Sequence, residues 1–198
     1  MNQRLKEEKI GKLLWKFSLP AIIAMLVNAL YNIIDRIFVG RGVGSIGIAA
    51  TTVAFPIMIV NMAVSMLIGV GATSLISIHL GEQKKKEAER VAGNAISTMI
   101  ALALLLTVIF LLFQDPILMF FGADEEVLPY ARDFTSIIML GSVFGTISLG
   151  VNNFIRAEGN PKIAMMTQIT GTLINIVLNY VFIFQLGLGI KGSALATI

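Results

Sequence analysis

The sequence predicts an all-α integral membrane protein, a bundle of six transmembrane helices whose sixth helix is incomplete. Its composition is 56% hydrophobic and only 14% charged over 198 residues. A soluble domain of this size could not bury so much apolar side chain. The apolar residues also gather in runs long enough to cross a bilayer, and the basic residues gather at one end of those runs.

A bilayer core takes about 20 mostly apolar residues per helix. Five runs meet this requirement, at residues 13–39, 52–79, 91–113, 131–155 and 163–186. A sixth run opens at 190 and reaches only 198, roughly half a crossing, so we expect the chain to continue. Residues 1–198 therefore form a single transmembrane domain, with no soluble domain or linker.

Positive charge in the connecting loops predicts the orientation, because cytoplasmic loops are rich in Lys and Arg. With the N-terminus inside, eleven of the 15 basic residues lie on the cytoplasmic side. The net charge of +3 thus indicates a partner surface of lipid rather than nucleic acid. The inner residues are Arg4, Lys6, Lys9, Lys12, Lys16, Lys84, Lys85, Lys86, Arg90, Arg156 and Lys162.

Several residues predict local features of the bundle. Pro20 and Pro56 lie inside apolar runs, where a missing N–H favours a helix bend. Gly141 and Gly145 have the spacing of a close helix–helix contact. The apolar stretch 115–122 is too short to cross, so we expect a brief helix at the outer interface.

Polar residues inside membrane helices are costly and therefore suggest function. Apart from Asp133 at the start of the fourth run, Asp35 is the only carboxylate within the five complete runs. It shares a helix face with Asn28 and Asn32, and the fifth run repeats such a polar stripe. Both stripes should line a cavity inside the protein. The residues of the second stripe are Gln168, Thr172, Asn175 and Asn179.

Depth in the membrane brings four of these positions together. At a rise of about 1.5 Å per residue, Asn179 and Thr197 each lie roughly 10 Å below the outer end of their helices. Asp35 lies at a similar depth in the first run. The spacing permits Asp35, Asn175, Asn179 and Thr197 to form one layer. The alternative is that the Asn residues only bond helices together and that Asp35 points outward beside Arg36.

The residues required for enzyme chemistry are missing from the sequence. It has no Cys, a single His, no phosphate-binding Gly-rich loop and no nucleophile elbow. We therefore expect neither an enzyme nor a bound cofactor.

Short motifs in a fixed order make the chain resemble the multidrug and toxic compound extrusion (MATE) transporters, especially their bacterial multidrug branch. The resemblance covers the whole chain and rests mainly on six segments. They are Ser-Leu-Pro at 18–20, Tyr-Asn-Ile-Ile-Asp-Arg-Ile-Phe-Val-Gly at 31–40, Phe-Gly-Ala-Asp at 121–124, Arg-Ala-Glu-Gly-Asn-Pro-Lys at 156–162, Asn-Ile-Val-Leu-Asn-Tyr at 175–180, and Gly-Ile-Lys-Gly-Ser-Ala-Leu-Ala-Thr at 189–197.

This resemblance implies the N-terminal lobe of a twelve-helix, pseudo-symmetric transporter in the bacterial plasma membrane. Small cationic drugs or toxic organic compounds would leave the cell in exchange for inward H⁺ or Na⁺, and a C-terminal lobe would complete the cavity. The family's N-lobe cation site maps onto Asp35, Asn175, Asn179 and Thr197. Many relatives carry Asp where Asn179 stands, so the identity of the coupling ion is open: four oxygens with one charge suit Na⁺, and a lone Asp in an apolar cavity can carry a proton.

Two other functions compete with multidrug efflux. A lipid-linked oligosaccharide flippase of the same superfamily would need Arg or Lys at membrane depth, and no apolar run carries one near its middle. A non-transporting membrane scaffold would leave the buried face of Asp35 without a purpose.

Overall fold

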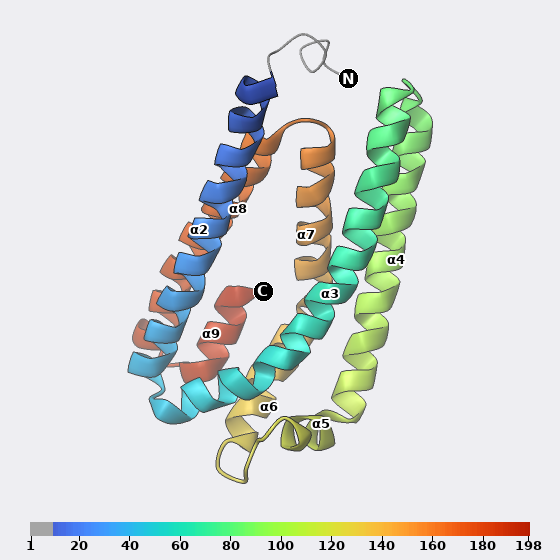
Figure 1. Ribbon diagram of the computed structural model, residues 1–198. Helices are drawn as coiled ribbons and strands as arrows, with labels where there is room; N and C mark the ends of the chain where they lie inside the picture. Colours follow the sequence, from blue (N-terminus) through green and yellow to red (C-terminus); the bar gives the residue numbers. More distant parts are fainter. Residues whose placement is uncertain (1–9) are drawn as a thin grey trace.

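The computed structural model describes residues 10–198, and this part is almost entirely helical, as predicted (Figure 1). Three of the predicted cytoplasmic bases, Arg4, Lys6 and Lys9, lie outside the described residues. The elements are α2 (Ile10–Gly42), α3 (Ser45–Gly81), α4 (Lys85–Leu112), α5 (Gln114–Phe120), α6 (Leu128–Leu140), α7 (Ser142–Ala157), α8 (Pro161–Tyr180), the π-helical segment η1 (Val181–Gln185) and α9 (Gly189–Thr197).

Four helices of the described part are long and apolar enough to cross a membrane, and α6 with α7 makes a fifth if that bent pair is one span. Their outer faces carry large apolar side chains in the open: Leu67 is 77% exposed and Leu112 is 73% exposed. Water would not tolerate such a surface, whereas lipid does. The protein is therefore a multi-pass membrane protein.

The long helices form two pairs, and α7 lies between them (Figure 1). Helices α2 and α8 run side by side, and α3 and α4 form a second pair. Helix α7 packs against α3, α4 and α8, while α6 and α9 pack together near the end of the molecule opposite the N-terminus.

Two apolar clusters hold α3, α4, α6, α7 and α9 together. The larger lies among α3, α4, α5, α6 and α9 and includes Leu118 of α5 and Ala194 of α9, both fully buried. The smaller surrounds Met99, where α3, α4 and α7 meet. Neither cluster contains a residue of α2. Helix α2 is instead attached mainly through α8 and through polar contacts described below.

The fourth predicted helix, 131–155, is broken rather than continuous. It divides at Gly141 into α6 and α7, whose axes differ by 52°. The break frees backbone groups, and the buried Thr107 hydroxyl of α4 donates to the Met139 carbonyl at 2.8 Å and lies 3.0 Å from the Ser142 hydroxyl. The Ile198 side chain packs where a Cβ of Gly141 would stand.

Pro20 and Pro56 lie inside uninterrupted helices, so the break in a span occurs at Gly141 and not at either proline. A bend at those prolines stays a prediction. The fifth predicted helix, 163–186, becomes α8 followed by η1, because Leu186 donates its N–H to the Val181 carbonyl at 2.9 Å.

Candidate functional site

A buried amide joins α2 to α8. The Asn179 side chain is fully buried, and its Nδ2 donates to Asp35 Oδ1 at 3.0 Å and to Asn175 Oδ1 at 2.9 Å. The two Asn residues sit one turn apart on α8, so both face the same way. Three of the four residues predicted to form one layer are therefore in direct contact.

The fourth predicted residue, Thr197 of α9, lies near the other three but contacts different groups. Its hydroxyl donates to the Ser193 carbonyl at 2.9 Å and lies 3.5 Å from the Tyr31 hydroxyl. Asn175 ties α9 to α8, because its Nδ2 donates to the Ala196 carbonyl at 2.8 Å. Thr197 thus joins the group through Tyr31 and the backbone of α9, without a direct bond to Asp35 in this state.

Two residues of this group were not predicted. Ser193 is fully buried, and its hydroxyl lies 3.4 Å from Asp35 Oδ1. Tyr31 stands one turn before Asp35 on α2 and reaches Thr197. Helical spacing could have suggested both, since each lies four residues from a predicted member. We call the complete group the polar layer: Tyr31, Asp35, Asn175, Asn179, Ser193 and Thr197.

The local backbone explains how three helices come this close. The π-helical η1 follows Asn179 after one residue, and α9 packs directly on it. Gly192 makes this possible, because a Cβ there would stand 2.9 Å from the Phe182 carbonyl carbon of η1. Segments of this kind inside α-helices are frequent at functional sites. The approach of α9 to η1 places Ser193 beside Asp35.

The other predicted cavity residues do not join the polar layer. Asn28 and Asn32 are exposed and bond to each other, with Asn32 Nδ2 donating to the Asn28 carbonyl at 2.8 Å. Gln168 and Thr172 are half-buried on α8. That these four line a cavity stays a prediction.

The polar layer can hold a small cation by its chemistry. It carries one carboxylate, and the Asn179 Oδ1 atom is buried without a hydrogen-bond partner among the described residues. A buried acceptor left unpaired costs about 1–3 kcal/mol. Residues 10–198 contain no group of three or more His, Cys, Asp or Glu that could hold a metal ion. Any cation here would meet amide, hydroxyl and carbonyl oxygens around one negative charge, which suits a proton or a hard monovalent ion.

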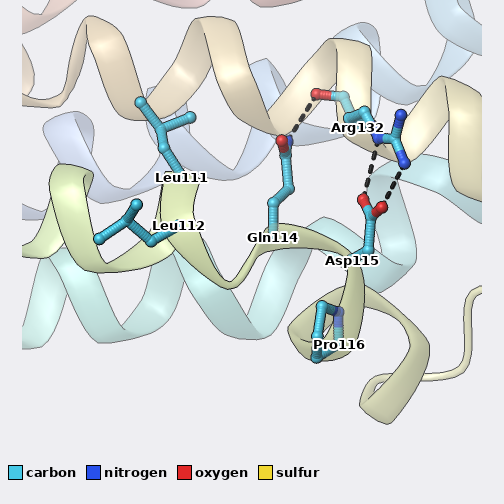
Figure 2. Close-up of a pocket in the computed structure, with 6 residues that line it drawn as sticks. All are labelled: Leu111, Leu112, Gln114, Asp115, Pro116 and Arg132. Carbon is cyan, nitrogen blue, oxygen red and sulfur yellow. Dashed lines mark hydrogen bonds and ion pairs between the residues drawn. The ribbon is translucent and has the colours of Figure 1, made fainter.

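A second group of polar side chains lies in a pocket between α5 and α6 (Figure 2). Figure 2 shows Arg132 and Asp115 pointing toward one another in a pocket that Gln114 also lines, with Arg132 Nε donating to Asp115 Oδ1 at 2.9 Å. Gln114 Nε2 donates to the Arg132 carbonyl at 3.0 Å and to the Ser136 hydroxyl at 2.7 Å. The guanidinium and the carboxylate neutralise each other. These contacts attach the short helix α5 to α6.

Known proteins match nearly the entire chain. The profile of the MatE family matches residues 20–181. The multidrug export protein MepA of Staphylococcus haemolyticus (strain JCSC1435) is 34% identical over 97% of this chain and 42% of its own length. MepA of Staphylococcus aureus (strain MSSA476) is 30% identical over 97% of the chain and 43% of its own length.

Solved structures agree in fold. The MATE multidrug transporter DinF-BH, solved as a complex with a ligand, superposes with a TM-score of 0.91 at 41% identity, covering 98% of this chain and 44% of its own. An outward-facing MATE transporter of the MOP superfamily superposes with a TM-score of 0.89 at 30% identity, covering 98% and 43%. The chain spans a little under half the length of these relatives, and its fold is that of one lobe. It belongs to the MatE family.

Proposed function

We propose that this chain is the N-terminal lobe of a secondary active transporter that exports small organic cations by alternating access. Inward movement of H⁺ or Na⁺ would drive the export. A second, C-terminal lobe would supply the other wall of the substrate cavity. The transporter would sit in the bacterial plasma membrane with the N-terminus of this lobe in the cytoplasm, since eleven of 15 basic residues fall on that side of the predicted topology.

The observation that carries the proposal is the contact of Asp35 with Asn179. A carboxylate at this depth is paired only with neutral donors among the described residues, at 3.0 Å from Asn179 and 3.4 Å from Ser193. Taking a charge out of water costs several kcal/mol unless it is neutralised. A proton or a Na⁺ ion would neutralise it. This imbalance supports Asp35 as the coupling group.

Ion binding can move a helix because α2 depends on the polar layer. The two apolar clusters contain no residue of α2, and the side chains of Asp35 and Tyr31 bond this helix to α8 and α9, beside its apolar contacts at Ala24, Phe38 and Val39. A cation on Asp35 Oδ2 would leave Asn179 Nδ2 on Oδ1 and would attract the unpaired Asn179 Oδ1 of α8 toward the carboxylate of α2. The position of α2 would then differ between the loaded and the empty state.

The flippase alternative is not favoured, because the relatives named above are multidrug exporters. Those relatives are transporters rather than enzymes, which fits the expectation of no catalytic site. A non-transporting scaffold would move no substrate in response to a pH or Na⁺ gradient, which the following experiment tests.

The transporter containing both lobes is reconstituted in liposomes, and efflux of a fluorescent organic cation is followed under imposed gradients. We expect either a pH gradient or a Na⁺ gradient to drive the dye against its own gradient. Coupled export would be contradicted if dye movement did not depend on the pH gradient or the Na⁺ gradient. It would also be contradicted if the dye only moved down its own gradient. Liposomes without protein provide the control for leakage.

A further inference from the structure

The hydroxyl of Ser193 has an unusual orientation for a helical residue. Ser and Thr hydroxyls in helices commonly bond back to the carbonyl four residues earlier. No such bond to Gly189 is present for Ser193, whose hydroxyl instead points at Asp35 Oδ1. The residue is fully buried, so water does not compete for the hydroxyl. The helical hydroxyls that do bond back include Ser65, Thr73, Thr135 and Thr197.

Two donors of the polar layer reach the same carboxylate oxygen of Asp35. Asn179 Nδ2 lies 3.0 Å from Asp35 Oδ1, and Ser193 Oγ lies 3.4 Å from it. The Ser193 bond is long, since O–H···O bonds usually measure about 2.7–2.8 Å. Asn179 is therefore the stronger donor. Asp35 Oδ2 has no hydrogen bond from the described residues, so the two donors together leave Oδ2 as the oxygen open to an ion.

From this arrangement we propose that Ser193 is a specificity-determining residue, which favours a metal cation over a proton on Asp35. The inference rests on the proposed function, in which Asp35 binds the coupling ion. Hydrogen bonds to an ionised acceptor are roughly twice as strong as those to a neutral one. A metal cation on Oδ2 leaves the carboxylate ionised and keeps most of the strength of the Ser193 bond, whereas a covalently bound proton neutralises the carboxylate and weakens that bond more.

Few other charges act on this choice. On α2, Arg36 and the Tyr31 phenol are the ionisable groups near Asp35. Helices α8 and α9 present only amides and hydroxyls to it: Asn175, Asn179, Ser193 and Thr197. The Lys191 ammonium of α9 is taken up by Asp133 at 3.2 Å. The neutral donors therefore distinguish Na⁺ from H⁺ on this carboxylate.

The test uses the two-lobed transporter in lipid nanodiscs and infrared difference spectroscopy. The carboxylic-acid band that Asp35→Asn removes reports the proton on Asp35. At the pH where half of the wild-type band is present, NaCl is titrated until the band disappears. We expect Ser193→Ala to need roughly three- to tenfold more Na⁺, because its proton competes better once the donor is lost. Ser65→Ala, which removes a buried hydroxyl bonded to Thr146 and remote from the layer, should match the wild type.

The possible outcomes distinguish a failure of this inference from a failure of the proposed function. If no wild-type band depends on Asp35 and responds to pH or Na⁺, the proposed ion site is wrong. If the band responds but Ser193→Ala titrates like the wild type, the role of Ser193 is wrong. At high pH, where no acid band remains, Na⁺ binding is followed by the shift of the Asp35 carboxylate band; a greater Na⁺ requirement that persists there would make Ser193 a direct Na⁺ ligand and overturn the inference. Ser193→Cys, with a similar volume and a weaker donor, should fall between wild type and Ser193→Ala and serves if the Ala variant does not fold.

Discussion

Replacing Gly141 by Ala should destabilise the protein, although Gly141 and Gly145 look equivalent in the sequence. A Cβ on Gly141 would stand 2.5 Å from Ile198 Cβ, with Ile198 Cγ2 closer still. Carbon atoms pack at about 3.5–4.0 Å, so α9 and the α6–α7 break must separate by about 1 Å. Overpacking of this kind costs about 1–3 kcal/mol of unfolding free energy.

Gly145→Ala is the matched control. A Cβ there would meet no heavy atom within 4 Å, and Gly145 lies inside α7. Ala is preferred to Gly in a helix by up to about 1 kcal/mol, so this variant should be neutral or slightly stabilised. The two glycines should therefore differ in sign as well as in size.

The assay is reversible unfolding of the chain in mixed micelles of increasing denaturing-detergent fraction, followed by circular dichroism. Gly141→Ala should unfold at a lower detergent fraction than the wild type, and Gly145→Ala at the same or a higher one. Equal losses of stability in both variants would instead support the close helix–helix contact that the spacing of the two glycines predicts. No loss in Gly141→Ala would show that the Ile198 contact can relax freely, which would refute the reasoning.

Three further predictions concern topology, the ion site and the broken span. In this chain without Cys, an impermeant thiol reagent applied to intact cells should label Glu125→Cys but not Lys85→Cys; the opposite pattern would reverse the orientation. In the two-lobed transporter, Asn179→Asp should keep efflux but weaken its Na⁺ dependence and change its pH profile, because two carboxylates about 3 Å apart retain a shared proton. An unchanged ion dependence would argue against the contact with Asp35. Thr107→Val should cost about 1–3 kcal/mol by leaving the buried Met139 carbonyl and Ser142 hydroxyl without this partner, whereas Thr98→Val, exposed and bonded only within its own helix, should cost under about 0.5 kcal/mol. Equal stability of the two Thr variants would contradict that role for Thr107.

Much of the fold follows from composition and periodicity. Apolar runs of bilayer length have few structural alternatives, so the number and order of the spans are readable from the sequence. The break at Gly141 was not predicted, because a single glycine within an otherwise apolar run does not by itself indicate that the helix divides there. The break is in contact with Ile198 and Thr107, which lie far away in the chain and come close only in the folded bundle.

The contacts of the polar layer were predictable in part. Helical depth placed Asp35, Asn179 and Thr197 at one level, and the structure brings their helices together there. Depth alone does not say which hydroxyl faces which carboxylate. Ser193 was overlooked because serine is common in membrane helices as packing, and only the approach of α9 to η1 at Gly192 directs its hydroxyl to Asp35.

The central claim is that Asp35 carries the coupling ion, and gradient-driven efflux by Asp35→Asn tests it most directly. Asn keeps the volume and much of the hydrogen bonding of Asp, so the bundle should stay folded and inserted. The matched control is Asp133→Asn, which removes a half-exposed carboxylate paired with Lys191 outside the polar layer. We predict that Asp35→Asn abolishes efflux driven by either a pH or a Na⁺ gradient and that Asp133→Asn retains it. Normal gradient-driven efflux by Asp35→Asn would contradict the account.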